Sequence, residues 1–111
     1  MEARTKIIFV DENGDKFFGE GPYQLLLGVE RTGSLRCAAM EMGMAYSKAM
    51  KLVRHAETAL GFPLTQRTVG GASGGGSCLT PQGKEWMSRY GDYRDACAQA
   101  NAQLYLEFFP G

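Results

Sequence analysis

The side chains best placed to do chemistry lie between residues 46 and 70, where basic residues outnumber acidic ones. Lys48, Lys51, Arg54 and Arg67 are opposed there by Glu57 alone. Lysine and arginine donate hydrogen bonds to phosphate oxygens and to the O6 and N7 atoms of guanine. Because the formal net charge of the whole chain is zero, this local excess favours a few specific contacts with a nucleic acid. A solvated helix face without a ligand is the alternative interpretation.

Other patterns indicate chemistry more weakly. The glycine-rich segment 70–77 lacks the Gly-Lys-Ser/Thr ending of a phosphate-binding loop. Three cysteines and one histidine at wide spacings form neither a disulfide framework nor a zinc site. Met40, Met42 and Met44 favour core packing over soft-metal binding, and His55 has no evident nucleophilic partner. We therefore expect no enzyme activity, no cofactor and no metal.

The residues before the basic stretch predict a helix followed by a tight turn. Ser34 is a good N-cap for a helix over about residues 34–42, because its hydroxyl can accept a hydrogen bond from an unpaired backbone N–H. Cys37, Ala38 and Met42 are expected to face inward from this helix. Gly43 suits the left-handed position of the turn that ends it.

A second helix is expected over about residues 45–60, ending at Gly61. Its apolar residues recur at helical spacing and predict a buried stripe: Ala49, Leu52, Val53, Ala56 and Leu60. Lys48, Lys51 and His55 fall on the opposite face. A helix with a basic outer face, presented by a short turn, is typical of a helix-turn-helix unit that enters the DNA major groove.

The segments on either side predict two hairpins. Residues 6–10 and 16–18 have strand composition and flank an Asn-Gly turn. After them, residues 23–31 predict a helix. Residues 63–69 and 78–79 enclose the glycine-rich segment and predict a two-stranded wing.

The C-terminal quarter of the chain predicts one long helix. Thr80 is a suitable N-cap and Pro81 a suitable first helical residue, and the helix is expected to continue to Phe108. At 1.5 Å per residue it would be about 42 Å long and would overhang a domain of this size. Its larger residues recur at spacings of three and four, as in a coiled-coil seam: Trp86, Tyr90, Tyr93, Cys97, Ala100 and Leu104. The seam predicts a homodimer, and folding back onto the chain's own core is the alternative.

Length and composition set the broad class. The chain has 111 residues, which suits a single domain over residues 1–111. The predicted elements indicate an α+β fold, mainly α: a winged helix-turn-helix with a short N-terminal hairpin and a long C-terminal dimerisation helix. No apolar run approaches the roughly 18–20 residues that span a bilayer, and the N-terminus lacks the apolar stretch of a signal peptide. We therefore expect a cytoplasmic protein without membrane contact.

Several short motifs, taken in order, resemble a known family. They are Thr32-Gly33-Ser34-Leu35 with Ala38-Ala39, the run from Gly43 to Val53, the glycines of the wing, and Leu79-Thr80-Pro81-Gln82-Gly83 with Tyr93-Arg94. Together, over roughly residues 20–95, they resemble the N-terminal DNA-binding domain of the molybdate-responsive ModE-type transcription regulators, which are relatives of the LysR-type winged helix. The resemblance implies a transcription regulator that binds double-stranded DNA as a homodimer.

This chain also departs from the family pattern. The family usually has Ser, a basic residue and Trp where this chain has Ala45, Ser47 and Met50, and often a basic residue near Ala72 in the wing. These differences concern the DNA sequence that is recognised and the strength of wing contact rather than the fold. Full-length members carry C-terminal molybdate-binding modules, whereas this sequence stops at Gly111, so we do not expect it to sense molybdate or another oxyanion.

The predicted DNA contacts fall into two groups. Base contacts are expected from the first turns of the 45–60 helix, the part of a recognition helix that reaches base edges: Tyr46, Ser47, Lys48 and Lys51. Phosphate contacts are expected from Ser34, Arg54 and Arg67. Two alternatives stay open at this point. One is a protein-interaction module that does not bind DNA, and the other is a dimer whose effector is a small oxyanion held at a helix N-terminus.

Overall fold

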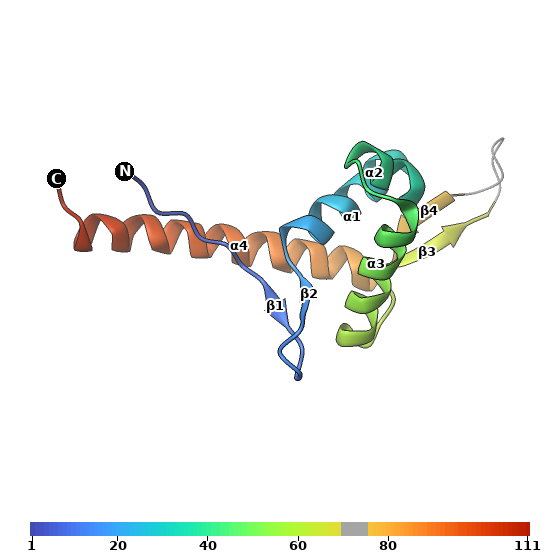
Figure 1. Ribbon diagram of the computed structural model, residues 1–111, viewed down its shortest axis with the longest axis horizontal. Helices are drawn as coiled ribbons and strands as arrows, with labels where there is room; N and C mark the ends of the chain where they lie inside the picture. Colours follow the sequence, from blue (N-terminus) through green and yellow to red (C-terminus); the bar gives the residue numbers. More distant parts are fainter. Residues whose placement is uncertain (70–75) are drawn as a thin grey trace.

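The computed structural model describes residues 1–69 and 76–111 and shows a winged helix-turn-helix with a long projecting helix (Figure 1). The described elements are, in chain order, β1 (Phe9–Val10), β2 (Lys16–Phe18), α1 (Glu20–Thr32), α2 (Leu35–Glu41), α3 (Tyr46–Leu60), β3 (Thr65–Thr68), β4 (Gly76–Leu79) and α4 (Pro81–Phe108). Strands β1 and β2 pair with each other, as do β3 and β4, and both pairs are antiparallel. The predicted fold class is confirmed. The predicted wing tip lies mostly outside the described residues.

Small residues allow α1 and α2 to pack closely. Gly28 lies against Ala38, so a Cβ atom on Gly28 would come within 2.9 Å of the Ala38 Cβ atom. Gly33, with φ of +74°, ends α1 in the left-handed region that favours glycine. The Ser34 hydroxyl then accepts a hydrogen bond of 3.1 Å from the backbone N–H of Cys37, which confirms Ser34 as the N-cap of α2.

The hydrophobic core lies where the helix-turn-helix, the hairpins and the start of α4 meet. Its largest fully buried side chains are Tyr90, Phe18, Leu25, Leu26, Leu64 and Val29. The N-terminal hairpin joins α4 through aromatic contacts: the ring centroids of Phe9 and Trp86 are 5.2 Å apart, and those of Phe18 and Tyr90 are 5.0 Å apart. Edge-to-face pairs of this kind add to the stability that burial provides. The hairpin therefore holds the first half of α4 against the domain.

Strand β4 of the wing is attached to the turn between α1 and α2. The backbone N–H of Ser77 donates a hydrogen bond of 2.8 Å to the carbonyl oxygen of Gly33. Gly76 passes so close to that oxygen that a Cβ atom there would overlap it. At the base of the wing, Thr80 donates from its backbone N–H to the Leu64 carbonyl oxygen at 3.0 Å. These contacts set where the wing leaves the domain.

Helix α4 has 28 residues, and its second half projects away from the other helices (Figure 1). The molecule is accordingly 58 Å long and 30 by 25 Å across. The N-terminal segment runs along the projecting half. Asn101 Nδ2 donates a hydrogen bond to the Ala3 carbonyl oxygen at 2.8 Å, and the Tyr105 hydroxyl donates one to the Met1 carbonyl oxygen at 2.9 Å. Every helix in the described parts of the chain is too short or too polar to cross a membrane.

Several predicted element boundaries differ from the structure. In the wing, β3 is Thr65–Thr68 rather than residues 63–69, and β4 begins at Gly76 rather than at residue 78. The first strand comprises Phe9–Val10 only, because residues 6–8 have no strand partner within the described hairpin. Helix α1 begins at Glu20 rather than Tyr23. Pro22 therefore lies inside the first turn, where a missing backbone N–H breaks no helical hydrogen bond.

The predicted inward face of α2 is wrong in part. The buried residues of this helix are Leu35, Ala38 and Ala39, whereas Cys37 and Met42 are exposed. Cys37 is two positions from Leu35 and thus points about 200° away from it at 3.6 residues per turn. Met42 follows the last helical residue, so helical spacing no longer sets its direction.

Candidate nucleic-acid interface

Helix α3 packs on one side and faces solvent on the other. Ala49, Val53 and Ala56 are buried, while Leu52 and Leu60, also predicted to be buried, are only half-buried. The four residues predicted to contact bases are all exposed: Tyr46, Ser47, Lys48 and Lys51. Ser47, Lys48 and Lys51 lie within about 100° of one another around the N-terminal end of this exposed face, whereas Tyr46, two positions before Lys48, points about 200° away from it at 3.6 residues per turn.

The positive charge of this face is not neutralised by nearby acids. Among the described residues, no carboxylate lies within ion-pair distance of Lys48, Lys51 or Arg54. Glu57, the single acid of this stretch, is turned toward the wing, where one of its oxygens accepts hydrogen bonds from the backbone N–H groups of Leu64 at 2.7 Å and Thr65 at 3.4 Å. Glu57 therefore supports the wing base and leaves the basic face uncompensated.

His55 lies nearer the C-terminal end of α3, where it meets the N-terminal hairpin. Its Nε2 atom is 3.5 Å from the Asp11 carboxylate. The pKa of Asp11 lies below its ordinary value, mainly because its carboxylate accepts a hydrogen bond from the backbone N–H of Asp15. The backbone N–H of Asn13 and the His55 side chain add smaller effects in the same direction, and some desolvation opposes them. This contact joins two elements of the fold and lies apart from the N-terminal turn of α3.

Arg36 belongs to the same surface, although sequence analysis did not select it. Its guanidinium carbon lies 4.2 Å from the ring centroid of Tyr46, and both residues are exposed. Arg36 is on α2 and Tyr46 is the first residue of α3. The sequence signal was a basic residue in the first turn of the preceding helix, but its contact with Tyr46 depends on the angle between the two helices.

The three predicted phosphate contacts lie on three elements. Ser34 is half-buried, and its hydroxyl oxygen caps α2 as described above, while its own proton has no acceptor among the described residues. Arg54 is exposed on α3. Arg67 is exposed on β3, opposite Ser77 of β4. The wing tip between these strands, residues 70–75, lies outside the described residues.

The predicted dimer seam divides into a buried and an exposed part. Tyr90 is only 2% exposed and packs within its own chain, so it offers almost no surface to a second copy. Trp86 is half-buried against the rings of Phe9 and Phe18. Tyr93 and Leu104 are each 52% exposed, and Cys97 between them is half-buried. Folding onto the chain's own core therefore accounts for the first part of the seam only.

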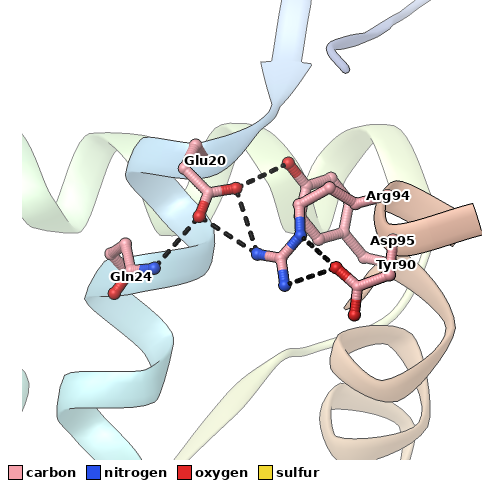
Figure 2. A network of polar contacts seen from close by, with 5 residues as sticks. All are labelled: Glu20, Gln24, Tyr90, Arg94 and Asp95. Atoms are coloured by element: carbon pink, nitrogen blue, oxygen red, sulfur yellow. Dashed lines mark hydrogen bonds and ion pairs between the residues drawn. The ribbon is translucent and has the colours of Figure 1, made fainter. Parts of the chain in front are cut away.

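A polar network joins α4 to the start of α1 (Figure 2). The Glu20 carboxylate accepts hydrogen bonds from Gln24 at 3.0 Å, Arg94 at 3.1 Å and the Tyr90 hydroxyl at 3.3 Å. Desolvation is the largest single influence on this carboxyl and opposes its ionisation, but the hydrogen bonds and the charge of Arg94 together hold the pKa of Glu20 below its ordinary value. Burial, with the neighbouring Glu20 charge, raises the pKa of Tyr90.

Residues 23–84, more than half of the chain, match the family described as bacterial regulatory helix-turn-helix proteins of the lysR family. The chain belongs to this family. The match runs from α1 to the first turn of α4 and thus includes α2, α3 and the wing. Members of this lysR family are DNA-binding transcription regulators. The lysR family is not a family of enzymes. The exposed basic face of α3 lies within the matched region.

A curated relative of this lysR-family chain is the molybdenum-pterin-binding protein MopB of Rhodobacter capsulatus, which is 39% identical over 67 residues. The alignment covers 60% of this chain and 25% of MopB, so the chain spans about a quarter of the length of this relative. The two matches confirm the resemblance to the N-terminal helix-turn-helix domain of ModE-type, LysR-like regulators that the sequence motifs indicated.

Proposed function

We propose that this chain binds a specific duplex DNA sequence as a homodimer, with α3 in the major groove and the wing, over about residues 69–78, beside the DNA backbone. The observation that carries the proposal is the exposed N-terminal face of α3, where Lys48 and Lys51 have no carboxylate partner among the described residues. An ion pair with a buried carboxylate would have given these two lysines a role in stabilising the fold. Their free ammonium groups are instead suited to DNA.

The proposed contacts differ in what they recognise. Side chains from the first turns of α3, drawn from Tyr46, Ser47, Lys48 and Lys51, contact base edges and determine sequence preference. Arg54, Arg67 and the Ser34 hydroxyl contact phosphates, which fix the position of the protein on the duplex without reading sequence. The hydrogen bond from Ser77 to Gly33 supports a defined position for Arg67, which lies opposite Ser77 in the wing.

The second half of α4 supports the proposed dimer. Tyr93, Ala100, Leu104 and Phe108 lie within about 80° of one another around the helix axis at 3.6 residues per turn, and all four are exposed. A surface hollow of about 260 Å³, lined by Phe9, Trp86, Arg89, Tyr90 and Tyr93, continues this strip toward the hairpin. An exposed apolar strip of this kind is typical of an interface, and a second copy of α4 would cover it.

Selection from a random-sequence pool of duplex DNA tests the proposal. The pool is incubated with the full chain, bound duplexes are amplified, and the affinities of the selected duplexes are measured at several salt concentrations. We expect a two-fold symmetric motif whose half-sites lie about 34 Å apart, one helical turn, and an affinity that falls steeply as salt rises. Failure to enrich any sequence would contradict the proposal and favour a protein-interaction module built on the same fold.

A further inference from the structure

Arg36 and Tyr46 form a contact between the first turns of two successive helices. The guanidinium carbon of Arg36 lies 4.2 Å from the centroid of the Tyr46 ring. Arg4, Arg31 and Arg94 each pair with a carboxylate, but Arg36 has no such partner among the described residues. The position of this positive charge therefore depends on a neutral aromatic ring.

The contact leaves the hydrogen-bonding atoms of Arg36 available. A guanidinium group that rests over an aromatic ring uses its flat face, whereas its N–H donors point outward in its own plane. Those donors match two oxygens of one phosphate. Because the ring already restricts the side chain, less conformational freedom is lost when a phosphate binds.

The location of the pair matches this chemistry. In helix-turn-helix proteins the first helix of the unit crosses the DNA backbone while the second enters the groove. Arg36 is in the first turn of α2, and Tyr46 begins α3, so the pair stands where the groove meets the backbone if α3 enters DNA as proposed above.

We propose that Arg36 contacts a backbone phosphate of the bound DNA and that Tyr46 is its positioning residue, acting through the face of its ring. The inference rests on the proposed function and deepens it, because it assigns to Tyr46 a role in holding Arg36 in place of a direct base contact. Tyr46 carries no charge, yet its ring would set the number of phosphates that the protein neutralises.

A set of four variants of the full chain tests this assignment with the selected duplex as the probe: R36A, Y46A, Y46F and the double variant R36A/Y46A. R36A should weaken binding about tenfold, similarly for all sequences, and reduce the slope of log affinity against log salt by about 0.9. Y46A should produce much the same loss of affinity and slope, and Y46F should bind within about twofold of the wild type. The double variant should be no weaker than R36A alone, as expected for residues that act as one unit.

Four results would overturn the inference. Equal loss in Y46F and Y46A would assign the contact to the hydroxyl group. An unchanged salt slope in Y46A, or additive losses in the double variant, would mean that Tyr46 acts independently of Arg36. A relaxed base preference in Y46A would restore Tyr46 as a base contact. Thermal unfolding checks that each variant is folded, and Y46L replaces Y46A if the latter is not.

The wild-type chain and K48A separate this inference from the proposed function. If the wild type selects no DNA sequence, the proposed function fails and the inference fails with it. If the wild type binds its selected duplex and K48A weakens that binding while R36A leaves it unchanged, the assignment of Arg36 and Tyr46 alone is wrong.

Discussion

Arg94 of α4 and Glu20 of α1 are joined by an ion pair of 3.1 Å between Nη1 and Oε1, although 74 positions separate them in the sequence. The same guanidinium lies 4.9 Å from the ring centroid of Tyr23. This relationship connects the helix that carries the proposed dimer strip to α1, the helix that packs against α2 of the helix-turn-helix. It therefore contributes to the angle at which a dimer would hold its two recognition helices.

Replacing Glu20 by Gln should destabilise the protein in a pH-dependent manner. The pKa of Glu20 is lowered in the folded protein, so its ionised form stabilises the fold above the unfolded-state pKa of about 4.3, and this contribution is lost as pH falls through the lower folded-state value. Because the side chain is 48% exposed, we expect a loss of only about 0.5–1 kcal/mol at pH 7.

Thermal unfolding of wild type and E20Q at pH 7, 5 and 3 measures this effect. The difference in Tm should be largest at pH 7 and should decrease as the pH is lowered toward 3. Glu30→Gln is the matched control, because Glu30 is exposed on the same helix and makes no side-chain hydrogen bond or ion pair within the described residues. A difference in Tm that is equally large at pH 7 and pH 3 would show that the charge of Glu20 is not its cause.

Replacing Gly28 by Ala should separate α1 from α2. The added methyl group would lie 2.9 Å from the Ala38 Cβ atom in a buried contact, and overpacking of this kind destabilises by about 1–3 kcal/mol. Gly21→Ala is the control, since Gly21 is on the same helix with no atom within 4 Å of the added methyl group. Urea unfolding should show a lower midpoint for G28A and an unchanged or slightly higher one for G21A. Equal midpoints for the two variants would contradict the close packing.

Removing the charge of Lys48 or Lys51 should weaken specific DNA binding by about 1–3 kcal/mol without changing the thermal stability. Both side chains are exposed and unpaired within the described structure, so the fold does not depend on them. Lys6→Ala serves as the control because Lys6 is an exposed lysine outside the helix-turn-helix. Fluorescence anisotropy with a labelled selected duplex gives the affinities. Wild-type affinity in both K48A and K51A would exclude this face of α3 from the groove.

Placing a charge on the exposed strip of α4 should dissociate the proposed dimer. Leu104→Glu would put a carboxylate at the middle of the strip, where a second copy would have to bury it unpaired. Leu106 is 68% exposed on the opposite face, two positions and about 200° away, so Leu106→Glu should leave the dimer intact. Sedimentation velocity over a range of concentrations distinguishes the two. A dimer that persists in L104E, or is lost equally in L106E, would place the interface elsewhere.

The sequence alone determined the elements whose signals are local. Ser34, Gly43, Gly61 and Thr80 act on backbone groups within a few residues of themselves, so the ends of α2, α3 and α4 could be predicted to within about two residues. Helical periodicity likewise separated the buried Ala49, Val53 and Ala56 from the exposed lysines of α3. Both kinds of signal depend on neighbours along the chain.

The tertiary structure alone decided which residues of these elements are exposed and which partners they contact. Periodicity showed that the α4 seam is apolar, but only the packing of Phe9 and Phe18 shows that Tyr90 is covered by its own chain while Tyr93 is exposed. The turn of Glu57 toward the wing and the contact of Arg36 with Tyr46 likewise depend on how separate elements meet. A residue's sequence neighbours set its secondary structure, whereas its charge partner and its exposure are set by segments that only folding brings beside it.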